Sequence, residues 1–155
     1  MVISHAQPLL LPLLVSYFFL PAALGVSQPF VSCNRTHKDR VNVRTVDITP
    51  HPIKLGVKSD ITIRGDTAIT IPEGATVEPS VEAAFPGFNK RPAPINRTYN
   101  LCDIAKCPVG PDSFMYTLSN LFTEEELPLN INIVHISIKD KKDTMMCVAV
   151  YLIVG

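Results

Sequence analysis

The amino-acid sequence predicts an all-β protein, an immunoglobulin-like β-sandwich made of two antiparallel sheets. From residue 26 onward, apolar residues recur with the period of two that is typical of half-buried strands, and no stretch sustains a helical period. Turn-forming residues divide the chain into roughly seven or eight short strands. Strands of this kind bury their apolar faces when two sheets pack against each other.

The segment 76–85 shows the alternation most clearly. Apolar residues alternate there with polar ones, among them Glu78 and Glu82, which predicts a strand with one face in solvent. Pro79 lies in the apolar phase and cannot donate a hydrogen bond to a neighbouring strand. We therefore expect this strand at the edge of a sheet, or with a bulge near Pro79.

An earlier strand changes phase in its middle. Val41 and Val43 share one phase of the alternation, whereas Val46 and Ile48 share the other. One extra residue in one strand of a pair produces such a change, so a β-bulge is expected between Val43 and Val46.

Two short apolar stretches, 61–63 and 69–71, flank the residues Arg64-Gly65-Asp66-Thr67. Because glycine and aspartate favour turns, the pattern predicts a hairpin with its turn at 64–67. The tripeptide Arg64-Gly65-Asp66 also matches an integrin-binding motif, but a turn explains the glycine without any partner.

The end of the chain predicts a second hairpin. Alternating residues at 134–138 lead through a charged turn at 140–143 into an apolar strand that runs to Val154. His135 lies in the polar phase, where a solvated side chain is expected. The sequence contains no nucleophile elbow, phosphate-binding glycine loop or His-Glu-x-x-His motif, so we expect a protein that is not an enzyme.

The composition predicts one domain and no attraction to nucleic acid. The chain has 155 residues, 46% of them hydrophobic, which is enough for a single packed core. Its 14 basic and 14 acidic residues cancel, so no net field draws the protein to nucleic acid or to an anionic membrane surface. Residues 26–155 are predicted to form the domain.

Residues 1–25 are predicted to be a signal peptide. The segment contains no Asp, Glu, Lys or Arg, and residues 9–20 are almost all apolar. Small residues at the end of the segment favour cleavage after Gly25, with Val26 as the first mature residue, and cleavage after Ser27 is the alternative. A membrane anchor is disfavoured, because the apolar run is shorter than the roughly 20 residues that a spanning helix needs.

Export gives the four cysteines an oxidising environment, in which disulfides persist. Three pairings of Cys33, Cys102, Cys107 and Cys147 are possible. The short spacing of Cys102 and Cys107 suits a local bridge, which would leave Cys33 to join Cys147. A zinc site is disfavoured because no histidine stands at ligand spacing beside the solitary cysteines.

Two N-glycosylation sequons agree with export. Asn34 and Asn96 are each followed by Arg and Thr, which fits the acceptor pattern. We expect glycans at both asparagines, and each sequon predicts an exposed loop.

Two motifs make the mature chain resemble the ML lipid-recognition domains, a family that includes the Niemann-Pick type C sterol carrier and the mite group-two allergens. Residues 101–109, Leu-Cys-Asp-Ile-Ala-Lys-Cys-Pro-Val, resemble the family's short cysteine loop. Residues 46–53, Val-Asp-Ile-Thr-Pro-His-Pro-Ile, and Gly56 resemble the early strand and Pro-x-Pro turn of plant members. The four-cysteine pattern is also similar to the plant branch.

The resemblance implies disulfides Cys33 to Cys147 and Cys102 to Cys107. It also implies a cavity between two splayed sheets, in which a lipid is held by its apolar part while any head group stays near the opening. It implies neither a cofactor nor a metal.

The resemblance further implies which residues contact the lipid. Those at the cavity mouth are Phe85, Phe88, Phe122, Thr123 and Leu127, and those along the wall are Phe114 and Tyr116. For each aromatic residue, ordinary core packing is the alternative interpretation.

Charged residues lie close to the expected mouth. Glu124, Glu125 and Glu126 are expected in a solvated loop, where they would discourage anionic head groups. Lys90 and Arg91 would instead attract a phosphate at the same rim.

The leading functional hypothesis is therefore a monomeric, non-enzymatic carrier of sterol or phospholipid, which contacts donor and acceptor membranes transiently. The alternative is a secreted lipid-recognition protein that docks a receptor in signalling or immunity. An adhesive sandwich with a filled core and no ligand is a third hypothesis. The expected location is extracellular or the lumen of a vacuole or lysosome.

Overall fold

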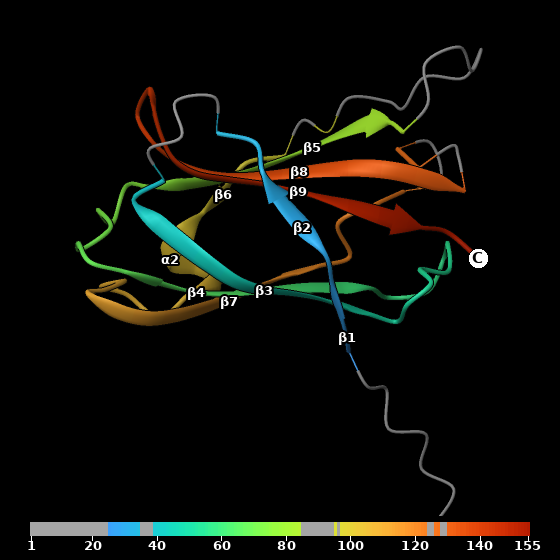
Figure 1. Cartoon of the computed structure of the whole chain (residues 1–155), viewed down its shortest axis with the longest axis horizontal. Helices are drawn as coiled ribbons and strands as arrows, with labels where there is room; N and C mark the ends of the chain where they lie inside the picture. The colour runs from blue at the N-terminus through green and yellow to red at the C-terminus, as the bar shows by residue number, and fades with distance from the viewer. Residues whose placement is uncertain (1–24, 35–38, 85–94, 96, 124–125, 128–129) are drawn as a thin grey trace, which may run out of the picture.

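A computed structural model describes residues 25–34, 39–84, 95, 97–123, 126–127 and 130–155, and these residues form two antiparallel sheets packed face to face (Figure 1). The four-stranded sheet has the order β1 (Val26–Gln28), β3 (Val41–Thr49), β4 (Asp60–Thr67), β7 (Asp112–Ser119). The five-stranded sheet has the order β2 (Phe30–Ser32), β9 (Asp143–Ile153), β8 (Ile131–Asp140), β5 (Thr76–Ala83), β6 (Tyr99–Asn100). The predicted all-β sandwich of two antiparallel sheets is confirmed.

The first two strands lie in different sheets although one residue separates them. In β1, Val26 pairs with Ile48 of β3, and in β2, Phe30 pairs with Val150 of β9. Pro29, which lacks a backbone N–H, lies between the two pairings. The chain therefore passes from one sheet to the other at this point (Figure 1).

The predicted bulge in β3 is confirmed. The pairing of β3 with β4 shifts register between Val43 and Thr45. On the two sides of this shift, Val41 and Val46 are both buried in the core. The extra residue thus allows both halves of the strand to present apolar side chains to the interior.

The hairpin predicted around residues 64–67 is wrong. Strand β4 runs unbroken from Asp60 to Thr67, and it pairs with β3 on one side and β7 on the other. The side chains of the tripeptide are held in the sheet, because Arg64 forms an ion pair with Asp47 and Asp66 forms one with Arg44. The hydrogen-bonded pairing of β4 with two strands along its whole length stabilises the extended conformation more than the local preference of Gly65 favours a turn.

The edge position predicted for Pro79 is confirmed. Strand β5 pairs with β8 from Thr76 to Ala83, but β6 covers its other side only at Thr76 and Val77. Among the described residues, the side of Pro79 away from β8 is therefore an unpaired edge, a position at which proline is tolerated in a sheet.

The predicted C-terminal hairpin is also confirmed, since β8 and β9 pair along their full lengths. The turn of the hairpin lies within residues 139–144. Inward-facing residues of both strands, such as Ile136 and Val148, are buried. This hairpin forms the centre of the five-stranded sheet.

The core lies between the sheets. Of the described strands in opposite sheets, β3 and β9 have the most residues near each other, so the two sheets are in contact on that side. Apolar side chains from both sheets, among them Ile48, Ile63, Ile136 and Val150, form one buried cluster.

The predicted signal peptide lies outside the described residues up to residue 24, and β1 begins at Val26, directly after Gly25. Among the helices that the structure describes, none is long and apolar enough to cross a membrane.

Candidate functional site

A short cysteine loop leads into β7 at the edge of the four-stranded sheet. Its helix, α2 (Leu101–Ile104), begins where the side chain of Asn100 accepts a hydrogen bond from the Cys102 N–H at 2.8 Å. The Cys102–Cys107 disulfide then closes the loop, with 5.4 Å between the two Cα atoms. Leu101 anchors the loop, because it is fully buried and its N–H donates to the carbonyl of Ala75.

The two predicted wall residues lie next to each other on β7. Phe114 and Tyr116 both point into the core, and their rings stack with centroids 6.2 Å apart and planes 12° apart. Tyr116 also pairs with Ile63 of β4 on one side and with Ala105 on the other. The wall assignment is compatible with this position, and so is ordinary core packing.

The predicted mouth residues divide into three groups. Leu127 is buried in the core, and Phe122 is half-buried against it. Thr123 is exposed, and its carbonyl accepts a hydrogen bond from the Leu127 N–H at 3.2 Å. Phe85 and Phe88 lie outside the described residues, as do Lys90 and Arg91.

The solvated state predicted for Glu126 is wrong. Its side chain is only 9% exposed and forms an ion pair with Arg97 at 2.6 Å. The same carboxylate oxygen accepts a hydrogen bond from the Thr123 N–H at 2.8 Å. Arg97 also donates to the carbonyl of Leu121, so it ties the segment before β6 to the segment after β7. Glu124 and Glu125 lie outside the described residues.

Sequence reasoning missed this Arg97–Glu126 pair for a simple reason. Three consecutive glutamates are typical of a solvated loop, and nothing near them points to an arginine 29 residues earlier. The pairing exists because the fold places the two segments side by side at the edge of the sandwich.

Tyr116 carries a buried hydroxyl group. Its side chain is 1% exposed, and among the described residues no group forms a hydrogen bond with the phenolic oxygen. Burial raises the pKa of Tyr116 well above its ordinary value, because the phenolate would lose its hydration. The hydroxyl group therefore stays protonated and available as a donor.

The space between the sheets is filled by apolar side chains. The core residues that the structure describes are almost completely buried, and 24 of them form one continuous cluster. Residues that line an open, acyl-chain-wide cavity would show larger exposed fractions. In this conformation the described side chains thus occupy the place where the resemblance puts a cavity.

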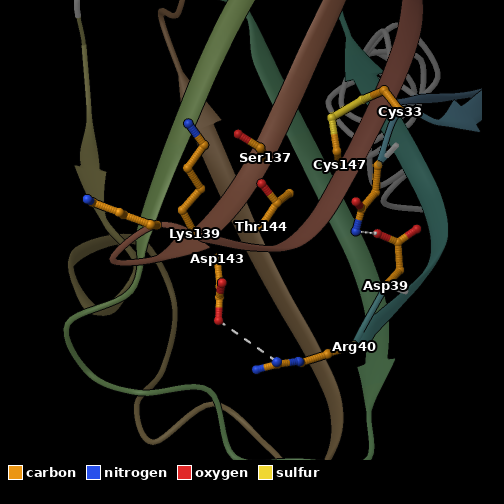
Figure 2. A pocket seen from close by; sticks show the side chains of 10 residues that line it. Cys33, Asp39, Arg40, Ser137, Lys139, Asp143, Thr144 and Cys147 are labelled. Atoms are coloured by element: carbon orange, nitrogen blue, oxygen red, sulfur yellow. Dashed lines mark hydrogen bonds and ion pairs between the residues drawn. A yellow bond between two sulfur atoms is a disulfide. The ribbon is translucent and has the colours of Figure 1, made fainter. Parts of the chain in front are cut away.

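A polar hollow of about 760 Å³ opens at the turn end of β8 and β9 (Figure 2). The Cys33–Cys147 disulfide forms part of its wall, and Arg40 faces Asp143 across it at 4.0 Å. Lys139 lies at the same place, but its ammonium group already pairs with Glu78 at 2.5 Å. The side chains that line the hollow are mostly polar or charged.

The exposure predicted for Asn34 is not found, and the other two residues of its sequon lie outside the described residues. Asn34 is 4% exposed, and its Nδ2 atom, to which a glycan would be attached, donates a hydrogen bond to Asp39 at 2.8 Å. Asn96 lies outside the described residues. Glycosylation at both positions stays a prediction.

His135 lies closer to cysteine than the sequence indicates. A ring nitrogen of His135 and the sulfurs of Cys33 and Cys147 lie within 4.8 Å of one another. Both sulfurs belong to the disulfide and so are not free to bind a metal ion. The Nε2 atom of His135 faces Glu82 at 3.4 Å instead.

The bridges Cys33–Cys147 and Cys102–Cys107 are the pairing that the family resemblance implies. Comparison with known proteins agrees with that resemblance. The family model described as "ML domain" matches residues 27–154. The chain is 41% identical to MD-2-related lipid-recognition protein ROSY1 of Arabidopsis thaliana over 152 residues, covering 96% of this chain and 89% of that protein. It is 30% identical to MD-2-related lipid-recognition protein 3 of the same plant, covering 96% and 92%.

A solved structure shares the fold. A Niemann-Pick type C2 protein from Japanese carpenter ant superposes with a TM-score of 0.57, over 82% of this chain and 99% of that chain. The two sequences are only 15% identical, so this likeness concerns the fold alone.

Proposed function

The chain belongs to the ML domain family, and from this premise we propose that it is a non-enzymatic carrier that binds a sterol or phospholipid between its two sheets and moves it between membranes. The observation that carries the proposal is the continuous apolar interior between the sheets, in a chain whose relatives are named lipid-recognition proteins. Apolar surface holds lipid without charged contacts, at about 0.8 kcal/mol for each buried CH₂ group.

Because side chains fill the interior, a lipid can enter only if the two sheets separate. The approach of β3 and β9 favours a hinge on that side. The opposite side, at β7, is covered by the cysteine loop and by the segment that the Arg97–Glu126 pair holds in place. We therefore place the entrance at the β7 side.

This entrance involves several of the candidate residues. Phe122 and Leu127 lie in the segment that Arg97 ties down, and Phe114 and Tyr116 lie on the strand behind it. Thr123 is exposed at the rim. Phe85 and Phe88 remain predicted mouth residues.

A vesicle assay tests the carrier function. We expect the mature protein to move labelled cholesterol or phosphatidylcholine from donor to acceptor vesicles and to carry lipid in native mass spectra. Phe122→Asp should lower the transfer rate at least about 10-fold, because its carboxylate would be desolvated at the entrance. Val57→Asp, in an exposed loop, is the matched control and should leave transfer unchanged. Absence of both bound lipid and transfer in the wild-type protein would refute the carrier proposal.

We also infer entry into the secretory pathway, with residues 1–25 as a signal peptide and glycans at Asn34 and Asn96. The two disulfides support this inference, since such bridges persist in oxidising compartments. The final location, extracellular or the lumen of a vacuole or lysosome, follows from the same entry route.

Lipid recognition with a receptor is the second candidate function. The outer face of the five-stranded sheet favours it, because Val31, Tyr151 and Ile153 expose apolar surface there. Exposed apolar side chains on neighbouring strands suit contact with another protein. Lipid binding without transfer, together with a stable complex with a membrane protein, would favour this function over the carrier.

A further inference from the structure

Tyr116 places a hydroxyl group in the buried interior of the sandwich. It lies in the middle of β7, between Ile63 of β4 on one side and Ala105 on the other. Its ring stacks on Phe114, two residues earlier on the same strand. Neighbours on both sides and along the strand therefore hold the ring in a defined position.

The hydroxyl group has no partner in the part of the chain that the structure describes. Proteins pair the great majority of buried polar atoms, because an unpaired one destabilises the fold. A phenylalanine ring would fill nearly the same space without that penalty. A hydrogen-bond partner on a bound ligand therefore explains why tyrosine occupies this position better than core packing does.

The chemistry of that partner follows from the surroundings. The hydroxyl group stays protonated, as its raised pKa implies, and so it offers a hydrogen to an acceptor. The buried polar and charged residues that the structure describes include no Lys or Arg that would neutralise an anion. A neutral oxygen, such as a hydroxyl, ketone or ester carbonyl oxygen, fits this position best.

The place of Tyr116 in the sheet also suits a ligand. Strand β7 is an edge strand, and β4 separates it from β3, the strand that contacts β9 of the other sheet. When the sheets separate about that closed side, the inner face of β7 is among the first surfaces that an entering lipid meets.

We propose that Tyr116 is a specificity-determining residue, whose hydroxyl group donates a hydrogen bond to a neutral oxygen on the buried part of the lipid. The inference rests on the proposed carrier function, and it adds the requirement that a preferred lipid has an oxygen atom in its buried part. Apolar surface retains the lipid, and an oxygen atom at the level of Tyr116 determines which lipid is preferred. An oxygen that stays outside the entrance does not form this bond.

The test uses lipid pairs that differ in the relevant oxygen atoms. One pair is cholesterol and cholest-5-ene, which lacks the hydroxyl group, and the other is a diester phosphatidylcholine and its diether analogue. Both members of a pair are offered in equal amounts, and native mass spectrometry measures the ratio bound. Tyr116→Phe removes only the hydroxyl group, and Tyr151→Phe does the same on the outer face of the five-stranded sheet.

We expect the wild-type protein to prefer the oxygen-bearing member of at least one pair by roughly 3- to 10-fold, the range for one hydrogen bond. Tyr116→Phe should lose this preference, and Tyr151→Phe should keep it. The inference is overturned if the wild-type protein binds both members of each pair equally, or if Tyr116→Phe keeps the preference. Either result would leave the proposed lipid binding intact. If the wild-type protein binds no member of either pair, both the inference about Tyr116 and the carrier proposal fail.

Thermal unfolding of the ligand-free proteins excludes a merely structural effect. Because the Tyr116 hydroxyl group has no described partner, Tyr116→Phe should unfold at the same temperature as the wild type or at a higher one. A clearly lower unfolding temperature would mean that the hydroxyl group is paired within the chain, and this too would overturn the inference.

Discussion

Gly65 lies where three strands of the four-stranded sheet meet. It pairs with Val43 of β3 and with Phe114 of β7. A Cβ atom at this position would lie 2.5 Å from the carbonyl oxygen of Asn42 and 3.0 Å from Cε1 of Phe114. The glycine is therefore required by the close approach of its neighbours, and through Phe114 it shapes the wall of the candidate lipid site.

Gly65→Ala should destabilise the protein by about 1–3 kcal/mol, because the methyl group overpacks a filled position. Denaturant unfolding measures this change. Gly74→Ala is the matched control, since no atom lies within 4 Å of the added Cβ, and its effect should stay within about 0.5 kcal/mol. Equal stability of the two variants would mean that the sheet accommodates the methyl group at Gly65.

In the segment between β7 and β8, the described residues include the Arg97–Glu126 ion pair, and backbone hydrogen bonds from Asn120 to Ser59 and from Val154 to Asn130 hold its two ends. Glu126 accepts hydrogen bonds from Arg97 and from the Thr123 N–H, and the carbonyl of Thr123 accepts from Leu127 at 3.2 Å. A carboxylate with these partners stabilises a turn that covers apolar side chains. If the entrance opens at the β7 side, the Arg97–Glu126 ion pair must either break or move together with the segment.

Glu126→Gln should lower the free energy of unfolding by about 1–2 kcal/mol, because a half-buried charge pair is lost. It should also speed lipid exchange in the vesicle assay, because the segment is held less tightly. Glu78→Gln removes a similar pair with Lys139 on the outer face of the five-stranded sheet. That control should cost no more than about 1 kcal/mol and leave exchange unchanged. Slower exchange in Glu126→Gln would exclude this segment as the covering of the entrance.

The two disulfides constrain the molecule very differently. Cys33–Cys147 joins residues 114 positions apart and connects the start of the domain to its last strand. Cys102–Cys107 spans five positions and closes only the cysteine loop. In the loop-entropy model, stabilisation grows with the length of the closed loop.

Replacing both Cys33 and Cys147 by serine should cost about 4.7 kcal/mol, because the unfolded chain gains the freedom of a loop of about 100 residues. The same change at Cys102 and Cys107 should cost about 2 kcal/mol. Urea unfolding of the two double variants compares them directly. A larger loss at the short loop would show that local packing outweighs chain entropy.

Local patterns were sufficient for much of the fold. The period of two predicts the strands, the phase change between Val43 and Val46 predicts the bulge, and Pro79 predicts an edge. Each of these features depends on residues close together in the chain. For the candidate site, the sequence indicated Phe114, Tyr116 and Leu127, which share one core, and it misjudged Glu126 and the exposure of Asn34.

The sequence alone determined the class of fold and, through the cysteine loop, the family, because periodicity and motif spacing are local properties of the chain. Only the tertiary structure decided that Gly65 lies in a central strand, that Glu126 is buried against Arg97, and that the Tyr116 hydroxyl group is buried without a hydrogen-bond partner among the described residues. These outcomes depend on contacts between residues far apart in the chain, where burial and pairing outweigh local preference.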